Sequence, residues 1–195
     1  MADKQATQAA VPRFQLVSGY RVAPDHLYHF GHCWVRRDPG NRLRIGVDDF
    51  AAKTLGPPDR FKLPREGDTV VRDRAAVQWF RNDHRAQFLS PVTGKVFAVN
   101  PVINTSPDSV SEDPYEDGWL MVIEPAVMSV DAKHLYNRES VTPWIEDEHK
   151  TLMKLLGPEY ERLAATGGEA SKDLFGRHPE IGWRNLVSTF LHTNP

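Results

Sequence analysis

Between residues 33 and 125, short apolar runs alternate with polar positions and are broken at regular intervals by turn residues. Residues 33–37 and 43–47 flank Asp-Pro-Gly-Asn at 38–41, which is a strong turn signal. Further strand-like runs lie at residues 60–63, 69–71, 75–80, 87–89, 95–99 and 118–123. Many short strands with regular turn signals predict a sandwich or a small barrel.

Before this region, Phe14, Leu16, Tyr20 and Val22 recur at period two, which predicts one strand with no evident partner. Residues 48–56 read as a short helix, because acidic residues stand at the start and a glycine at the end.

After residue 125 the pattern becomes helical. Thr142 is a candidate N-cap with Pro143 at the first helical position, and the apolar face of this helix reaches Leu156. A second short helix is expected to end near Thr166. A last helix carries the apolar stripe Trp183, Leu186, Val187, Phe190 and Leu191. We expect this stripe to pack on its own domain, and docking on a partner protein is the alternative, since helices this few and short could hardly form a separate core.

This change of pattern predicts three parts: a flexible tail at residues 1–12, a β domain at 13–125 and a helical C-terminal extension at 126–195.

Apolar residues make up 40% of the 195, enough for a core, and the formal net charge is 24 − 26 = −2. No global positive field would therefore attract nucleic acid. No apolar run is long enough to insert into a membrane and the N-terminus does not resemble a signal peptide, so we expect a cytoplasmic protein.

Four segments within the β domain follow the pattern of a known family. They are HCWV at 32–35, GVDDFA at 46–51, FLSPVTGKV at 88–96 and DPYEDGWL at 113–120. In order and spacing they resemble the glycine cleavage system H protein over about residues 28–125. The resemblance implies a barrel-sandwich hybrid of the lipoyl/biotinyl type. The expected fold class is therefore mainly β with C-terminal α, a barrel-sandwich hybrid plus a helical extension.

The resemblance also implies where the family attaches its lipoyl arm: on a lysine at a β-hairpin tip, eight residues before the proline of Ser-Pro-Val. Eight residues before Pro91 stands Asp83, and no lysine lies between Lys62 and Lys95. The arginines near this position stay protonated and cannot form the lipoyl amide. We therefore expect no lipoyl arm and no cofactor.

The predicted tip still provides a candidate partner-binding patch, because arginine and tryptophan are frequent interface anchors. The patch consists of Trp79, Phe80, Arg81, Asp83, His84 and Arg85. Adjacent strand residues face opposite sides, so one of the two aromatic residues should face outward unless the helical extension or a partner covers it. We interpret Asn82-Asp83 as a polar turn. The alternative, an acid–base pair of Asp83 and His84, lacks a pocket.

Zinc binding is a further alternative, since imidazole and thiolate are zinc ligands and His26, His29, His32 and Cys33 are close in sequence. We expect no metal, because His32 and Cys33 belong to the family-like opening. The acidic pairs, such as Asp48-Asp49, fall where a helix or turn begins. Neither a phosphate-binding loop nor a catalytic-triad motif is present, so we expect no catalytic residues and no enzyme activity.

These observations predict a non-lipoylated scaffold or adaptor subunit that binds partner proteins, such as a redox or one-carbon multi-enzyme complex. The alternative is a lipoyl-carrying H protein of the glycine cleavage system with its arm on an unexpected residue. A metal-dependent enzyme built around residues 26–33 is a third hypothesis.

Overall fold

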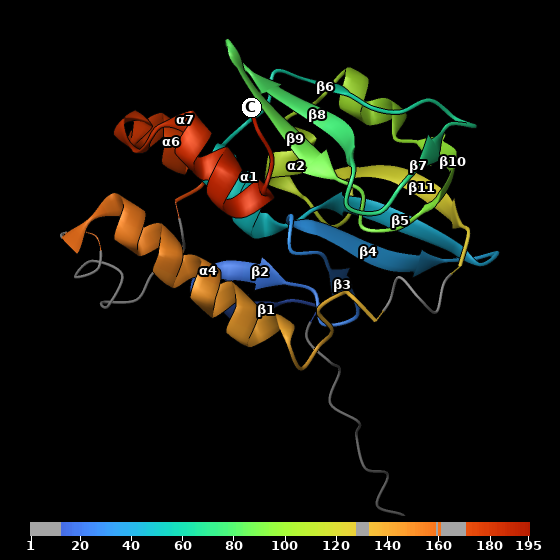
Figure 1. The fold of residues 1–195 in the computed structure, drawn as a ribbon, viewed down its shortest axis with the longest axis horizontal. Helices are drawn as coiled ribbons and strands as arrows, with labels where there is room; N and C mark the ends of the chain where they lie inside the picture. The colour runs from blue at the N-terminus through green and yellow to red at the C-terminus, as the bar shows by residue number, and fades with distance from the viewer. Residues whose placement is uncertain (1–12, 128–132, 159, 161–170) are drawn as a thin grey trace, which may run out of the picture.

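A computed structural model describes residues 13–127, 133–158, 160 and 171–195 of the chain. The fold is mainly β, and the helices that follow residue 140 lie on one side of it, on the left in Figure 1. This arrangement confirms the expected mainly β class with C-terminal α. No helix of the described ranges is both long and apolar enough to cross a membrane.

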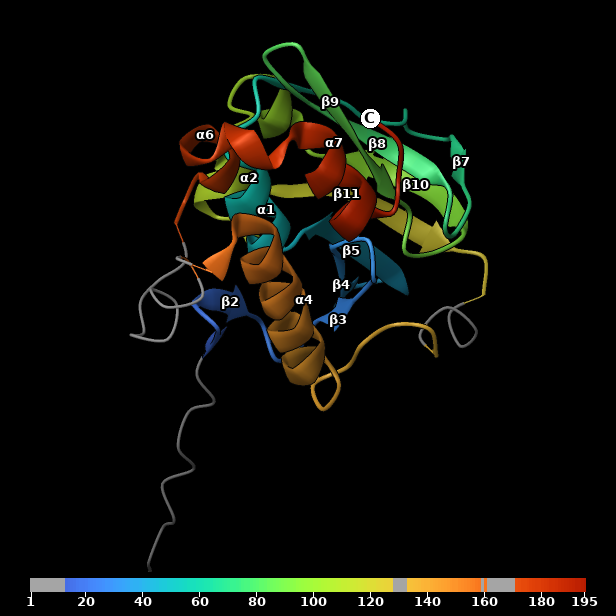
Figure 2. The ribbon, with the colours of Figure 1, turned by 60° about the vertical axis from the view of Figure 1, so that its left-hand side comes forward.

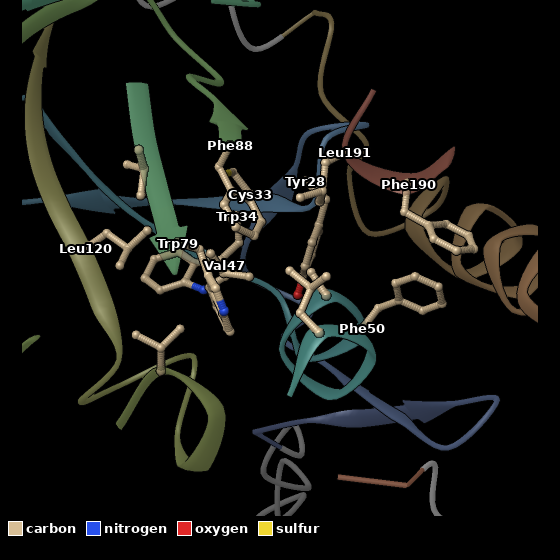
Figure 3. Packing of buried hydrophobic residues seen from close by; sticks show 14 of the residues in the cluster. Tyr28, Cys33, Trp34, Val47, Phe50, Trp79, Phe88, Leu120, Phe190 and Leu191 are labelled. Atoms are coloured by element: carbon tan, nitrogen blue, oxygen red, sulfur yellow. The ribbon is translucent and has the colours of Figure 1, made fainter. Parts of the chain in front are cut away.

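The largest sheet has six antiparallel strands in the order β3-β4-β5-β11-β10-β7. Its strands are β3 (Leu27–Tyr28), β4 (Cys33–Asp38), β5 (Arg42–Val47), β7 (Thr69–Val70), β10 (Gly94–Val99) and β11 (Trp119–Pro125). A second sheet, in the order β6-β8-β9, consists of β6 (Arg60–Lys62), β8 (Ala75–Arg81) and β9 (His84–Leu89). Buried side chains from both sheets form one core, including Trp34, Trp79, Phe88 and Leu120 (Figure 3).

The N-terminal strand-like pattern folds as a hairpin and not as the single strand that we expected. Its strands are β1 (Gln15–Val17) and β2 (Tyr20–Val22), which pair with each other. The chain reverses at Ser18 and Gly19, whose φ angles of 50° and 84° lie in the left-handed region. The reversal breaks the period-two pattern, so Leu16 is 61% exposed. The buried side chains are Val17, Tyr20 and Val22.

Helix α1 (Asp49–Leu55) agrees with the expectation. The carboxylate of Asp48 caps it by accepting a hydrogen bond from the Ala51 amide at 2.9 Å, and Gly56 ends it with a φ of 77°. Two short helical turns, η1 (Pro101–Asn104) and α2 (Ser109–Glu112), precede β11.

Helix α4 (Val141–Leu156) begins earlier than expected. Its N-cap is Ser140, so the prediction of Thr142 as the cap is wrong. Pro143 is accommodated inside the first turn, where the amide that proline lacks would have no intrahelical partner. The short helix expected to end near Thr166 lies outside the described residues.

The last part of the chain forms α6 (Leu174–Arg177), η2 (Pro179–Ile181), α7 (Trp183–Leu186) and η3 (Val187–Leu191). We call residues 171–195 the C-terminal segment. The predicted stripe of five apolar residues is buried, and the rings of Phe190 and Phe50 lie 5.1 Å apart (Figure 3). The stripe therefore packs on its own domain, as expected, and α6 and α7 lie beside α1 and the β8–β9 hairpin in both views (Figures 1 and 2).

Candidate functional site

The β8–β9 hairpin contains the candidate residues from the sequence. Its tip is the two-residue turn Asn82-Asp83 between the paired residues Arg81 and His84. Asn82 has a φ of 49°, a conformation that asparagine tolerates better than most residues, and its amide donates a hydrogen bond to Asp59. Asp83 is exposed at the tip. The polar turn that we expected is therefore present.

Arg81 connects the hairpin to the C-terminal segment. Its Nη1 and Nη2 atoms lie 2.6 and 2.8 Å from the two carboxylate oxygens of Asp173, and Nη1 also donates to the Leu55 carbonyl. Burial acts to raise the pKa of Asp173, but hydrogen bonds from Arg81 and from the Gly176 amide outweigh it and lower this pKa. A two-point pair between guanidinium and carboxylate fixes orientation as well as distance.

Two glycines leave the space that this ion pair needs. A Cβ on Gly56 would lie 2.2 Å from Arg81 Nη1, and a Cβ on Gly176 would lie 2.2 Å from Asp173 Oδ2. Side chains at either position would displace the guanidinium or the carboxylate. The contact is therefore built into three segments that are far apart in the sequence.

The C-terminal segment also covers one side of the tip and the free edge of β9. The ring of His84 stacks on Trp183 at 5.2 Å and meets the edge of Phe175 at 5.1 Å. Trp183 Nε1 donates to the Arg85 carbonyl at 2.7 Å, and Thr193 Oγ1 donates to the Gln87 carbonyl at 2.9 Å. These contacts satisfy edge carbonyls that would otherwise be open to another strand.

The structure divides the predicted patch into three groups. Trp79 is fully buried beneath the sheet (Figure 3), so including it in a contact surface was wrong. Arg81 and His84 contact the C-terminal segment. Phe80 and Arg85 remain at least partly accessible on the other side of the hairpin, and Asp83 is exposed at its tip. His84 and Asp83 are therefore not placed as an acid–base pair, because the imidazole is held in an aromatic contact.

The three histidines of the zinc hypothesis each pair with a different carboxylate. His26 contacts Asp25, His29 contacts Asp73 and His32 contacts Asp48, each at 2.8 Å. Cys33 is buried, and burial raises its thiol pKa. Within the described ranges, no group of three or more His, Cys, Asp or Glu residues is arranged to hold a metal ion.

Asp48 and Asp49 have structural partners. Besides capping α1, Asp48 pairs with His32 inside the core. Asp49 is fully buried and accepts hydrogen bonds from the backbone and side chain of Arg21, and Lys53 Nζ lies 2.9 Å from its Oδ2 atom. The expectation that these acids begin a helix agrees with this arrangement.

Sequence reasoning missed the residues that hold the hairpin from outside it. Asp173 is the N-cap of α6, a role for which its position before an apolar pair is a recognisable signal. No local pattern indicated that the same carboxylate binds Arg81. Arg60 and Lys62 of β6 were also missed, although they share a face of the second sheet with Phe80 and Arg85.

Comparisons with known proteins agree with this fold. A family profile described as glycine cleavage H-protein matches residues 26–148. The glycine cleavage system H protein of Xylella fastidiosa (strain Temecula1) is 36% identical over 119 residues, covering 60% of this chain and 90% of the relative. The protein of the same name from Listeria monocytogenes serotype 4a is 36% identical over 115 residues, covering 59% and 90%.

A solved structure is also similar. The crystal structure of a glycine cleavage system H protein from Mycobacterium marinum has a TM-score of 0.51 and 25% identity, and the match covers 55% of this chain and 88% of that chain. This similarity supports the barrel-sandwich hybrid fold.

The family match continues past residue 125 to residue 148, so it extends farther than the resemblance that we expected and includes the first half of α4. The C-terminal segment lies outside it. Membership in this family accords with a non-catalytic protein. The chain belongs to the glycine cleavage H-protein family.

Proposed function

We propose that this chain is a non-catalytic, protein-binding member of the H-protein family with no lipoyl arm on its β8–β9 tip. The observation that supports this most directly is that the chain's own C-terminal segment covers one side of the hairpin, at the two residues that flank the tip. Arg81 is paired with Asp173, and His84 is stacked on Trp183. A carrier arm must leave its hairpin freely to visit other active sites, whereas this hairpin is held from one side.

The composition of the tip also supports the proposal. The position that the family resemblance assigns to the lipoyl-lysine is Asp83, whose carboxylate cannot be acylated as an amine is. The whole stretch 63–94 contains no lysine. The barrel around the tip is nevertheless intact, so the surface that a partner would recognise can persist without the arm.

The second candidate function is that of the relatives, a lipoyl-carrying H protein of the glycine cleavage system. The names of the similar proteins favour it. On this chain it would require a lysine elsewhere. The exposed lysines of the described ranges are Lys62, Lys95, Lys133, Lys150, Lys154 and Lys172.

The partners would be proteins in either case. For the first candidate we propose a redox or one-carbon enzyme complex, to which the chain would contribute a rigid docking surface. For the second, the partners would be the other components of glycine cleavage.

Intact mass spectrometry separates the two candidates. The full chain is co-expressed with a lipoyl ligase and supplied with lipoate, and the Xylella relative is treated in parallel as the positive control. We expect the lipoyl mass on the relative and none on this chain. A lipoyl mass on this chain, mapped to one of its lysines, would establish the carrier and end the proposal of an armless subunit.

A further inference from the structure

We infer that the outward face of the β6-β8-β9 sheet docks an acidic, extended segment of a partner protein. The inference rests on the proposed protein-binding function and names the chemistry of the partner. It concerns the side of the hairpin opposite to the one that the C-terminal segment covers. We call the residues Arg60, Lys62, Phe80 and Arg85 the basic face.

Strand register places these side chains together. Arg60 pairs with Phe80, and Phe80 pairs with Arg85, so the three residues form one row across the three strands. Lys62, Gln78 and Gln87 form the next row on the same face, because residues two apart in a strand share a side. The row between them contains Trp79 and Ala86, which are both fully buried and therefore face the core.

The three cations of the basic face have no carboxylate partner in the part of the chain that the structure describes. Arg60, Lys62 and Arg85 are exposed, and none of them forms an ion pair with another described residue. Most arginines of the six-stranded sheet, in contrast, are paired with carboxylates: Arg36 with Glu116, Arg42 with Glu124 and Arg44 with Asp38. Three unpaired positive charges on one small face favour a negatively charged occupant.

One of these cations is already ordered. The guanidinium carbon of Arg60 lies 3.5 Å from the centre of the Phe80 ring, a cation–π contact. This contact reduces the side-chain entropy that binding would otherwise remove from the arginine.

A groove continues the basic face and suggests the shape of its occupant. The groove has a volume of about 230 Å³ and lies between the chain after β6 and the first half of β8. Its lining includes the apolar side chains of Leu63 and Ala76 and the cations of Lys62 and Arg65. Its one carboxylate, that of Asp68, accepts a hydrogen bond from the Arg65 amide. An apolar side chain of the partner fits beside its acidic residues.

The spacing of the cations favours an extended segment. Arg60 and Lys62 are two residues apart on one strand, which separates them by about 7 Å, the distance between alternate side chains of an extended peptide. Acidic residues at alternate positions would therefore meet both. Nucleic acid is a poorer fit, since the chain has a net charge of −2 and affinity for a phosphate backbone comes from many neutralised phosphates, whereas the basic face offers few cations.

Fluorescence anisotropy of the full chain tests the inference with a labelled peptide of alternating Glu and Val. We expect saturable, salt-sensitive binding that the pair Arg60→Glu and Arg85→Glu weakens by at least about tenfold. The matched control pair is Arg37→Glu and Arg138→Glu, two exposed arginines outside the basic face, and it should change binding by less than about twofold. Lys62→Gln provides a milder variant, with a loss of about threefold expected.

Three outcomes would overturn the inference. An equal loss of peptide binding in the control pair would mean that binding depends only on the total charge of the chain. Equal binding of a peptide with the same composition in separate Glu and Val blocks would remove the role of spacing. Tighter binding of duplex DNA or of anionic vesicles than of the peptide would identify another class of partner. Lipoylation is measured separately, so a lipoyl mass shift would end the armless proposal without affecting this result.

Discussion

Asp173 and Arg81 stand 92 positions apart in the chain and form a two-point ion pair that joins the C-terminal segment to the hairpin tip. The arginine side chain is 12% exposed and the aspartate 33%. We predict that Asp173→Asn loosens the C-terminal segment and lowers the free energy of unfolding by about 1 kcal/mol, since partial exposure weakens the pair. Hydrogen exchange of the β9 amides and urea unfolding measure the two effects.

The control for this variant is Asp147→Asn, which removes an exposed pair with Lys150 at a distance of 2.8 Å. It should leave both measurements nearly unchanged. Similar losses in the two variants would mean that the Arg81 pair is no more important than an ordinary surface contact.

Gly176→Ala should destabilise the protein, although alanine is the better helix former. The added Cβ would lie 2.2 Å from Asp173 Oδ2 and 2.7 Å from Arg81 Nη2. We expect a loss of about 1 to 2 kcal/mol in urea unfolding, the usual effect of overpacking. The double variant Gly176→Ala with Asp173→Ala should be no less stable to urea than Asp173→Ala alone, because the carboxylate that the new Cβ would contact is absent. Additive losses would contradict the steric explanation.

Stability should fall as the pH rises from about 6.5 toward 9, and His32 is the reason. Burial alone would lower the pKa of this imidazole, but Asp48 and then Glu148 of α4 raise it to about 9. A pKa higher in the folded than in the unfolded chain stabilises the fold fully below the unfolded value, and the effect is lost as the pH passes the folded value. Urea unfolding at pH 6, 7.5 and 8.5 checks this trend below the range in which the Cys33 thiol would ionise in the unfolded chain.

The groups that surround His32 make the pH prediction specific. Its Nδ1 lies 2.8 Å from Asp48, its Nε2 lies 3.7 Å from Glu148 without a hydrogen bond, and its ring stacks against Phe50 and Trp144. Asp48→Asn should cost about 3 to 5 kcal/mol at pH 6, because a buried charge loses its partner. Glu148→Gln should reduce the fall in stability above pH 6.5. It should lower the free energy of unfolding at pH 6 by less than Asp48→Asn does. A flat profile between pH 6.5 and 8.5 would contradict this assignment.

Two other histidines should lower the stability of the fold at acidic pH. Burial lowers the pKa values of His26 and His29. The folded chain therefore binds fewer protons at these groups than the unfolded chain, and their contribution should weaken stability as the pH falls below about 6.5.

Cys33 should resist alkylation until the protein unfolds. The thiol is 2% exposed, and its raised pKa keeps it protonated at neutral pH, while the thiolate is the reactive form. Iodoacetamide labelling followed by mass spectrometry should show one adduct in urea and almost none in native buffer. Rapid native labelling would mean that β4 opens locally, since Cys33 is its first residue.

The sequence predicted the strands of the barrel well, but it predicted the contacts between distant segments poorly. Turn residues and alternation are local signals, so most strands and the Asp48 cap of α1 were predictable. The β1–β2 reversal was missed because Ser18 continued an apparent period of two. The stripe around Phe190 was visible at helical spacing, but the ring that it contacts, Phe50, was not. The Arg81 pair was unpredictable because ion pairs between distant segments leave no periodic pattern.

The covered edge of β9 has a consequence for self-association. If the C-terminal segment were cut away, the Arg85 and Gln87 carbonyls would lose the donors from Trp183 and Thr193. An open strand edge beside buried aromatic residues pairs readily with the same edge of another copy. The segment thus blocks the hydrogen-bonding edge of β9, and a protease that removed it would open this edge to pairing with another copy of the chain.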